Sequence, residues 1–518
     1  MTPTSHIEIP DDHRGLYRLF EILPGTISWL LLILPLIFSF RYPLAVSSVL
    51  ILYTLFWLIR AIRMNARLIA GYLRYRTAIK RDWLVECESL PAELGWNELR
   101  QVVIMTWYNE DKSILKASIQ SLIQSHYPLK RIFFVLAVEE RGGPAVRQAA
   151  EELKQEFKGQ FGDFMIALHP GDIAGEVRGK GANITYAAKL VRTELDQKGI
   201  DYEQAVVTTL DADNRVHPKY LANLAFMFLT DVDPLHHSYQ PIPMFFNNIW
   251  DVPLPIRSIS VGSSFWQLTE SMRPHRLRNF SSHAQGFAAL VATDFWSVHT
   301  IVEDGHQYWR TFFRFNGRHS VVPLYVPIYQ DAVLSPKGYL ASFQEQYLQK
   351  RRWAWGVSDV PYVFTRLLRR RTFSVDAWIQ AFRLLEGHVS WATTSLMLAV
   401  VGWAPIYLNR SFRATVLAVN YPLLYERILQ TAAFGLVISF MVSLLMLPPF
   451  PKGRKKVSLS FILEWSTAPF LLPITNVLFG ALPSLESQTR LMFGKYLGFH
   501  VTEKAAQRHE QESLVAKH

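Results

Sequence analysis

Two uncharged runs rich in Leu, Ile and Phe lie near the start of the chain, at residues 22–40 and 42–59. Each is long enough for a helix of about 20 residues, the length that crosses the hydrocarbon core of a bilayer. We therefore predict a transmembrane hairpin. The alternative is a cleaved secretory signal, but Glu8 and Glu21 precede the first run and a second run follows it almost at once, which disfavours such a signal.

Apolar runs return near the end of the chain, at 388–408, at 428–449 and in a proline-interrupted tract at 457–485. They predict a C-terminal membrane block. Basic residues follow the hairpin and the run at 428–449, and such flanks stay on the cytoplasmic side of a membrane. The part between the two blocks is therefore predicted to be cytoplasmic, in a multi-pass protein of the plasma (inner) membrane. Because the residues after 485 are also basic, we expect the last tract to be re-entrant or tightly bent.

Between the membrane blocks, short apolar runs alternate with amphipathic stretches. The apolar runs, predicted as strands, lie at 101–106, 131–138, 164–169 and 205–210. The amphipathic stretches, predicted as helices, lie at 111–126, 145–157 and 183–196. This alternation is typical of an α/β sheet with helices on its faces. Ligands bind such sheets beyond the carboxyl ends of the strands.

Polar residues follow three of the predicted strands at that end. They are Tyr108, Asn109 and Glu110 after the first strand, Glu139 and Glu140 after the second, and Asp211 and Asp213 after the fourth. Each group alone has an ordinary explanation, because Asp and Asn are common at helix N-caps. Two carboxylates one residue apart, however, can share Mg²⁺ or Mn²⁺ and leave ligand positions for diphosphate oxygens. Asp211 and Asp213 are therefore the candidate metal ligands.

A further pair of carboxylates, Glu303 and Asp304, opens a helical stretch at 301–314. A carboxylate in a site of this kind can act as a general base. Base-assisted attack opposite a leaving group inverts the attacked carbon, as in inverting carbohydrate hydrolysis.

An amphipathic helix is predicted at 343–355. It carries a run of polar and aromatic residues: Gln349, Lys350, Arg351, Arg352 and Trp353. Arginine can hold a diphosphate through paired hydrogen bonds, and a Trp face can stack on a sugar ring. The alternative is a basic helix that lies on anionic lipid.

The composition agrees with a chain that lies partly in lipid. Of 518 residues, 50% are hydrophobic and 19% charged, which is more apolar than a wholly soluble protein. The net charge of +11 fits an anionic membrane surface or a phosphate-bearing substrate. Nucleic acid is not an expected partner, because the basic residues gather at the membrane flanks. Cys87 is the only cysteine, so neither an intramolecular disulfide nor a cysteine zinc site is expected.

Four motifs of this chain resemble those of the processive membrane family 2 glycosyltransferases, the group of cellulose, hyaluronan and chitin synthases. They occur in the family's order: Asp211-Ala212-Asp213 for DxD, Glu303-Asp304 for TED, Gln349-Lys350-Arg351-Arg352-Trp353 for Q(Q/R)xRW, and Phe499-His500-Val501-Thr502-Glu503-Lys504 for FxVTxK. The resemblance runs from the N-terminal hairpin to Lys504.

The resemblance implies a GT-A-type, Rossmann-like glycosyltransferase domain between two transmembrane blocks. The implied divisions are an N-terminal segment and hairpin (1–79), the cytoplasmic catalytic domain (80–338), interface helices (339–387), the C-terminal membrane block (388–485), and a gating loop with a short tail (486–518). The implied function is an inverting polysaccharide synthase that takes sugar from a nucleotide sugar, in the family commonly a UDP-sugar, and exports the glycan. A single addition to a lipid-linked acceptor, and a catalytically inactive scaffold or transporter, are the alternatives.

The resemblance also implies roles for single residues. Asp211 and Asp213 would hold the donor diphosphate and the metal, and Asp304, beside Glu303, would be the base. Arg351 and Arg352 would face the diphosphate, and Trp353 would face the acceptor. The gating loop would close over the nucleotide; its residues are Phe499, Val501, Thr502 and Lys504. Lys180 and Asn183, in the Gly-rich stretch 178–183, are similar to a family segment near the phosphates, although a plain loop into a helix explains that stretch equally well.

Three positions depart from the family's pattern. Glu139 and Glu140 stand where an aspartate usually reads the nucleotide base, which weakens that assignment. Val302 replaces the Thr of TED, and Lys350 replaces the usual Gln or Arg. Neither replacement removes a carboxylate that the chemistry needs.

Overall fold

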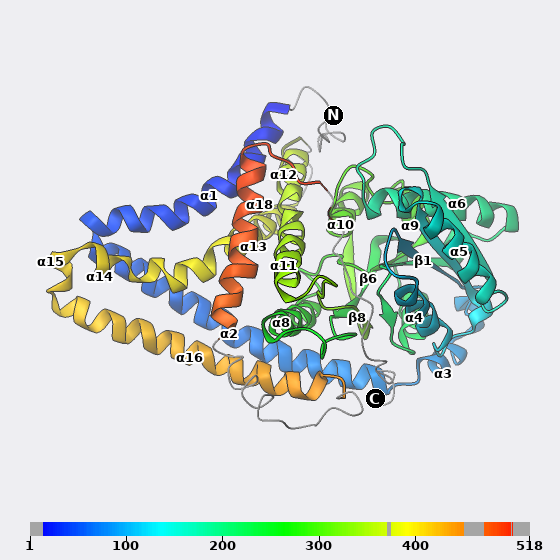
Figure 1. The fold of residues 1–518 in the computed structure, drawn as a ribbon, viewed down its shortest axis with the longest axis horizontal. Coiled ribbons are helices and arrows are strands. Elements are labelled where there is room, and N and C mark those ends of the chain that lie inside the picture. The colour runs from blue at the N-terminus through cyan, green and yellow to red at the C-terminus, as the bar shows by residue number, and fades with distance from the viewer. Residues whose placement is uncertain (1–13, 370–373, 450–470, 499, 501–518) are drawn as a thin grey trace.

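The computed structural model describes residues 14–369, 374–449, 471–498 and 500. An α/β part lies on the right of Figure 1, and long helices extend from it to the left. Two of these, α1 (Arg14–Arg41) and α2 (Pro43–Lys80), follow each other with one residue between them. Pro43 begins α2, where the missing N–H of proline costs nothing because the first N–H groups of a helix have no partner within it.

The helices α1 and α2 are long and apolar enough to cross a membrane. Apolar side chains along them lie on the surface; Phe40, Val49 and Leu52 are 62%, 63% and 66% exposed. A continuous apolar surface of this kind is covered by lipid or by another protein. The predicted N-terminal hairpin is therefore present as a pair of helices of suitable length, and α2 continues as a helix well beyond the predicted second run.

The C-terminal membrane block predicted over 388–485 is not evident as a set of spans among the described residues. There, one further candidate occurs, the pair of Val375–Ala399 (α13) and Val401–Leu408, bent by 45°. α13 begins before the predicted run, and Pro405 stands where a straight continuation would need its N–H. Helix α16 (Val416–Met446) lies alongside α2 (Figure 1). Residues 450–470, which include the start of the proline-interrupted tract (457–470), lie outside the described residues.

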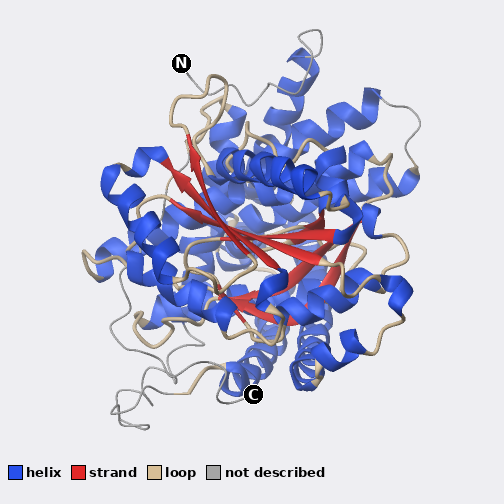
Figure 2. Cartoon of the chain, turned by 90° about the vertical axis from the view of Figure 1, so that its right-hand side faces the viewer, coloured by secondary structure: helices blue, strands red, loops and turns tan. Residues whose placement is uncertain are grey.

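One sheet of eight strands forms the centre of the α/β part, in the order β3-β2-β1-β4-β7-β6-β8-β5. Figure 2 shows the strands in red, with helices around them. The strands are β1 (Arg100–Trp107), β2 (Ile132–Glu139), β3 (Asp163–His169), β4 (Ala205–Leu210), β5 (Arg215–Val216), β6 (His237–Met244), β7 (Ala284–Gly286) and β8 (Ser320–Tyr329). β1 to β4 run parallel to one another. β7 is antiparallel to both β4 and β6, which makes the sheet mixed.

Helices cover both faces of the parallel half. One face packs on α4 (Lys112–Ile123), α5 (Pro144–Glu156) and α7 (Tyr220–Leu229), and the other on α6 (Lys180–Lys198) and α9 (Phe287–Ala292). Val103 and Met105 of β1 join the first core, and Val102 and Ile104 join the second. Successive side chains of a strand point to opposite faces, so a strand covered on both sides is apolar throughout. This explains why β1 to β4 were visible in the sequence as unbroken apolar runs.

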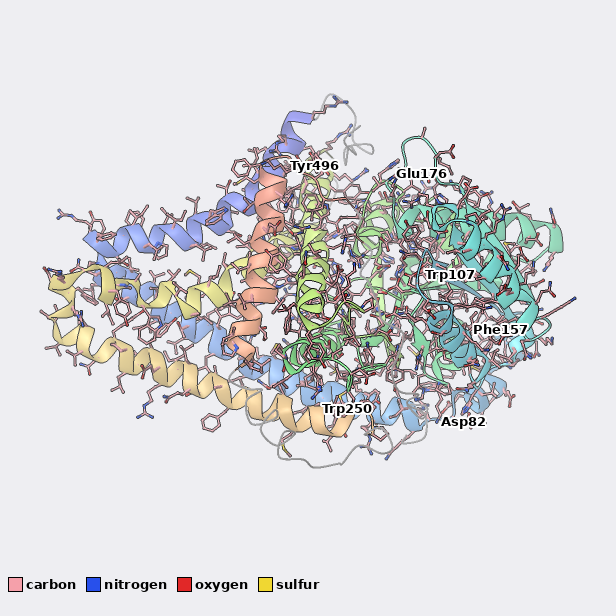
Figure 3. The ribbon with its side chains drawn as sticks, viewed as in Figure 1. Asp82, Trp107, Phe157, Glu176, Trp250 and Tyr496 are labelled. Carbon is pink, nitrogen blue, oxygen red and sulfur yellow. The ribbon has the colours of Figure 1, made fainter. Side chains whose placement is uncertain are left out.

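Eight further α-helices are described. They are α3 (Trp83–Glu88), α8 (Leu254–Ser271), α10 (Glu303–Arg314), α11 (Tyr339–Ala354), α12 (Asp359–Arg369), α14 (Ala404–Leu408), α15 (Arg410–Arg413) and α18 (Leu482–Met492). α18 packs between α1 and α11 (Figure 1). Gln488 of α18 accepts a hydrogen bond from Ser28 of α1 at 2.6 Å, and Tyr496, labelled in Figure 3, donates to Glu21 of α1 at 2.9 Å.

The predicted α/β class is confirmed, and the predicted strands and helices coincide with β1 to β4 and with α4, α5 and α6. The other half of the sheet was missed. β5 and β7 contain only two and three residues, too few for a pattern. β6 and β8 each contain two prolines, and proline argues against a strand because it cannot donate to the ladder.

Candidate active site

The polar strand ends of β1, β2 and β4 meet at one edge of the sheet. β1 lies between β2 and β4 and runs parallel to both, so the three carboxyl ends face the same side. Val138 of β2 pairs with Trp107, and Leu210 of β4 pairs with Met105. The loops that follow the three strands therefore start side by side.

Lys180 brings together carboxylates from two of the predicted motifs. Its ammonium Nζ lies 3.0 Å from Asp211 Oδ1, 3.5 Å from Asp304 Oδ1 and 3.8 Å from Glu303 Oε1. The Lys180 side chain is only 9% exposed, so water screens these charges weakly. One buried cation thus joins the loop after β4 to the carboxylates that open α10.

Lys180 and Glu303 are the first residues of their helices, and a close approach of the two helix starts makes the contact. α6 begins at Lys180 and α10 at Glu303. A Cβ at Gly181 would lie 2.5 Å from the carbonyl oxygen of Ser297 and 3.0 Å from Glu303 Cβ. Only glycine therefore allows this distance between α6 and α10. The Gly-rich stretch at 178–183 is a loop that leads into a helix, which is one of the two interpretations of its sequence. Its Gly181 also allows Lys180 and Glu303 to approach each other.

Gly181→Ala is expected to destabilise the protein although alanine favours helices. The added methyl group overlaps a backbone carbonyl of the facing segment, and overpacking of this kind costs about 1–3 kcal/mol. The matched control is Gly262→Ala in α8, where a Cβ would meet nothing within 4 Å; it should be neutral or stabilising by up to about 1 kcal/mol. Chemical unfolding of the purified variants measures both, and equal effects would contradict the proposed close approach.

Asn183 lies within the first turn of α6 and is 1% exposed. Its Nδ2 donates to the carbonyl oxygen of Ala137 in β2 at 2.9 Å. This bond ties the start of α6 to the sheet, so Asn183 has a structural role, and its predicted contact with a donor stays a prediction.

His283 is a site residue that the sequence did not indicate. Its Nδ1 lies 3.4 Å from Asp304 Oδ1, and the indole Nε1 of Trp296 donates to its Nε2 at 3.1 Å. An indole N–H can only donate, so Nε2 is the acceptor and Nδ1 carries the ring proton, which lies between the Phe280 carbonyl oxygen, at 3.2 Å from Nδ1, and Asp304. No motif in the sequence around residue 283 marks this histidine; it reaches Asp304 because β7 lies beside β4.

The two carboxylates at the start of α10 differ in their ionisation. Burial and the negative charge of Asp304 raise the pKa of Glu303 to about 8, against the opposing charge of Lys180. Burial also disfavours the charged form of Asp304, but the charge of Lys180 and the N–H of His283 outweigh it and lower the pKa of Asp304. At neutral pH, Glu303 is mostly protonated and Asp304 carries the negative charge. Of the two, Asp304 is therefore ready to accept a proton.

Asp211 and Asp213 have different surroundings. The Asp211 side chain is 34% exposed, and its Oδ2 accepts from Ser281 Oγ at 2.7 Å. Asp213 is 3% exposed, and its Oδ2 accepts from the backbone N–H of Asp331 at 2.9 Å. The two carboxylates are thus held by different segments of the chain, and their predicted role as ligands of Mg²⁺ or Mn²⁺ stays a prediction. In the described part of the chain, no group of three or more His, Cys, Asp or Glu residues is arranged to hold a metal ion.

The residues at the ends of β1 and β2 form a second polar cluster. Arg141 donates to Glu139 Oε2 through two nitrogens, at 2.6 and 3.1 Å, and its guanidinium lies 5.7 Å from the ring centre of Tyr108. Glu139 is therefore already paired by its own loop. Glu140 accepts from the backbone N–H of Gly171 at 3.3 Å. These contacts join the ends of β1, β2 and β3.

The loop after β1 is held by hydrogen bonds between a side chain and the backbone of the same loop. Glu110 Oε2 accepts from the backbone N–H groups of Tyr108 and Asn109 at 3.1 and 3.2 Å. Glu110 thus shapes the loop, and its predicted role in donor binding stays a prediction.

His169, the last residue of β3, lies between two carboxylates. Its Nδ1 is 3.5 Å from Glu139 Oε2, and its Nε2 is 2.9 Å from Glu176 Oε2. Glu176 is labelled in Figure 3. Burial opposes protonation, but hydrogen bonds and charges of Glu139 and Glu176 outweigh it and raise the pKa of His169. Only the protonated ring can donate to both carboxylates at once.

The stability of this cluster should fall as pH rises. Because the pKa of His169 is raised on folding, its contribution is complete below the pKa of the unfolded chain and is lost as pH rises through the folded value. Thermal unfolding midpoints at about pH 6 and about pH 8 measure the loss. His169→Gln, which cannot be protonated, should remove that part of the pH dependence; an unchanged pH dependence would contradict this assignment.

The run at 349–353 spreads its side chains in several directions from α11. Arg351 forms an ion pair with Glu486 of α18 at 2.7 Å, so it faces α18. Arg352 lies close enough to Glu303 for its charge to lower the pKa of that carboxyl. The structure thus separates the two arginines that the resemblance treated alike: Arg351 pairs with Glu486, and the charge of Arg352 acts on Glu303.

Gln349, Lys350 and Trp353 line a small cavity of about 10 Å³, room for about one water molecule. Asp331, whose N–H binds Asp213, lines the same cavity. The cavity therefore adjoins the Asp211–Asp213 loop. Phe245 faces Trp353 across it, with ring centres 5.5 Å apart.

Phe499, Val501, Thr502 and Lys504 of the predicted gating loop lie outside the described residues. His500 is described, and its Nε2 lies 2.8 Å from Glu345 Oε2 of α11. This end of the chain therefore reaches the helix that carries Trp353.

No protein-family model matches this chain, and no curated protein matches it. Among solved structures, a mannosyltransferase of Pyrobaculum calidifontis, PcManGT, in complex with GDP-Man and Mn²⁺, is 13% identical with a TM-score of 0.43, over 87% of this chain and 100% of its own. S. aureus TarS 1–349 in complex with UDP-GlcNAc is 13% identical with a TM-score of 0.30, over 78% and 94%.

Proposed function

We propose that this protein is a nucleotide-sugar-dependent glycosyltransferase of the inverting type. The observation that carries the proposal is the position of Lys180, within 4 Å of Asp211, Glu303 and Asp304. Lys180 thereby brings two candidates into one buried cluster: Asp211, proposed to bind the diphosphate and the metal, and Asp304, proposed as the base. The four sequence motifs and the mixed α/β sheet support the same assignment.

The donor is proposed to lie at the carboxyl edge of β1, β2 and β4. Its diphosphate would meet Lys180 and Arg352, whose charges both lower the pKa of Glu303, while Arg351 is engaged with Glu486. Lysine and arginine bind phosphate oxygens through charge-assisted hydrogen bonds. A bound Mg²⁺ or Mn²⁺ held by Asp211 and Asp213 would neutralise charge that develops on the diphosphate.

Transfer then needs one base. The acceptor hydroxyl oxygen attacks the anomeric carbon, and its proton passes to the carboxylate of Asp304. The bond between that carbon and the diphosphate oxygen breaks, and its electron pair leaves with the nucleoside diphosphate. Attack from the side opposite the leaving group inverts the anomeric carbon. Asp304 suits the role because it is ionised, whereas burial keeps Glu303 mostly protonated at neutral pH.

We further propose that the enzyme works at the cytoplasmic face of the plasma (inner) membrane and adds sugars repeatedly to a nascent glycan that it exports. The support is the pair of apolar helices α1 and α2 and the basic flank that follows the second run. Addition of one sugar to a lipid-linked acceptor uses the same chemistry. Product length separates the two: a polymer from purified protein and labelled donor supports processive synthesis, and a single added sugar contradicts it.

A screen of nucleotide sugars with a nucleotide-release assay tests the proposed function. Release from one donor, dependent on Mg²⁺ or Mn²⁺, is the expected result. No release from any donor, with folded protein and added metal, would favour the scaffold or transporter alternative.

A further inference from the structure

An arginine-rich cluster lies where three segments meet: α2, α13 and the loop after α8. Glu386 of α13 forms ion pairs with Arg60 of α2 and with Arg276 of that loop, the latter at 3.5 Å. Tyr53 of α2 also donates to Thr394 of α13 at 3.2 Å, so the two helices lie side by side and run in opposite directions. The cluster therefore lies beside two candidate membrane spans, α2 and the bent pair that α13 begins.

The positive charges of this cluster outnumber the negative ones. Burial lowers the pKa of His275 in the same loop, and the charges of four arginines around it lower that pKa further. These arginines are Arg67, Arg273, Arg276 and Arg383. With Arg60, five arginines share two paired carboxylates, Glu386 and Glu270, the partner of Arg273. Like charges at short range repel one another, so a bound anion would stabilise this arrangement.

Part of the hydrogen-bonding capacity of the cluster is not used within the described chain. Arg67 and Arg383 are half-buried, and neither forms a hydrogen bond or an ion pair with a described residue. The side chain of Arg273 is 13% exposed, and its Nε is buried without a hydrogen-bond partner. A guanidinium has five N–H donors, and a buried donor without a partner is unfavourable. A ligand with several acceptor oxygens would satisfy these groups.

The cluster borders apolar side chains that face outward. Ile59 and Ile62 of α2 and Phe382 of α13 are all more than half exposed. Arg60 comes directly after the predicted membrane run that ends at Ile59, and Arg383 directly follows Phe382. Charged and apolar groups thus adjoin at the predicted cytoplasmic end of the span, the depth at which lipid headgroups lie.

We propose that this cluster binds the phosphate group of an anionic membrane lipid. Guanidinium groups bind phosphate oxygens through paired hydrogen bonds, and basic pockets between transmembrane helices bind lipid headgroups. The acyl chains would lie along the exposed apolar side chains of α2 and α13. A free anion would use the charges alone, whereas a lipid uses both the charges and the apolar border. This inference goes beyond the proposed sugar transfer and does not depend on it.

Binding of labelled lipids to the full-length protein in a neutral detergent tests the proposal. Phosphatidylglycerol and phosphatidylcholine with identical acyl chains differ in the net charge of the headgroup. We expect phosphatidylglycerol to bind about tenfold more tightly, since each arginine at a membrane surface contributes about fivefold for an anionic lipid. Equal affinities for the two lipids would overturn the proposal.

Inorganic phosphate is the probe that separates a lipid site from a site for a free anion. It lacks acyl chains, so at constant ionic strength it should displace labelled phosphatidylglycerol only at concentrations roughly 100-fold above those of the unlabelled lipid. Displacement by inorganic phosphate and by the unlabelled lipid at equal concentrations would overturn the assignment to a lipid.

Arg383→Gln removes one charge of the cluster without breaking a hydrogen bond or an ion pair between described residues. Phosphatidylglycerol should bind about fivefold more weakly, while phosphatidylcholine binding and the unfolding midpoint stay close to those of the parent. Arg67→Gln is a second variant of the same kind. Unchanged phosphatidylglycerol affinity in both variants would overturn the assignment to this cluster.

Arg410→Gln is the matched control. Arg410 is exposed, and its neighbour Asn409 donates to the carbonyl oxygen of Phe40 beside the start of α2. At 1.5 Å per helical residue, that end of α2 is about 25 Å from Arg60. The control should keep the parent's preference for phosphatidylglycerol. An equal loss in Arg410→Gln and Arg383→Gln would show that the overall positive charge, and not this cluster, attracts the lipid.

Discussion

Asp304→Asn is expected to reduce turnover by at least about 100-fold, because a positioned base typically contributes 10²–10⁴-fold. The amide keeps the shape of the side chain but cannot take the proton of the acceptor hydroxyl. Donor binding should persist, since Lys180, Asp211 and Asp213 remain. Nucleotide release under saturating donor measures turnover, and calorimetric titration with the donor measures binding.

Glu303→Gln is the matched control for this variant. At neutral pH the pKa of about 8 leaves Glu303 mostly protonated, and glutamine resembles the protonated acid in shape and hydrogen bonding. Its turnover should therefore fall much less than that of Asp304→Asn. Larger loss in Glu303→Gln than in Asp304→Asn would move the base role to Glu303.

Lys180→Met is expected to lower kcat/KM by about 100-fold, the usual effect of removing a preorganised charge from a site. The ammonium now compensates Asp211 and Asp304 inside the cluster. It also lowers the pKa of Asp304, so its removal should raise that pKa. The acidic limb of the pH–rate profile should then move to higher pH, because Asp304 will be protonated, and inactive as a base, at a pH where the parent still works.

Lys180→Arg is the control that keeps the positive charge. It should leave the acidic limb near its original position even if the larger guanidinium reduces the rate. A limb that shifts equally in Lys180→Met and Lys180→Arg would show that packing, and not charge, sets the ionisation of Asp304.

The sequence by itself determined the parallel half of the sheet and the N-terminal pair of apolar helices. Buried strands such as 132–138 are apolar throughout because helices cover both faces. A helix long enough to cross a membrane is visible as one run of consecutive uncharged residues. These patterns are local, so they can be recognised without the fold. The candidate carboxylates Asp211, Asp213 and Asp304 were visible for the same reason, as short motifs at the ends of elements.

The tertiary structure alone decided how those residues meet. The contact of Lys180 with Asp211 and Asp304 depends on the close approach of α6 and α10 at Gly181. His283 faces Asp304 because a three-residue strand, β7, adds next to β4. Arg351 and Arg352 are neighbours in sequence but leave α11 on different sides, since successive residues of a helix are turned by about 100°. Distances between elements far apart in the chain are set by packing, and no local pattern contains them.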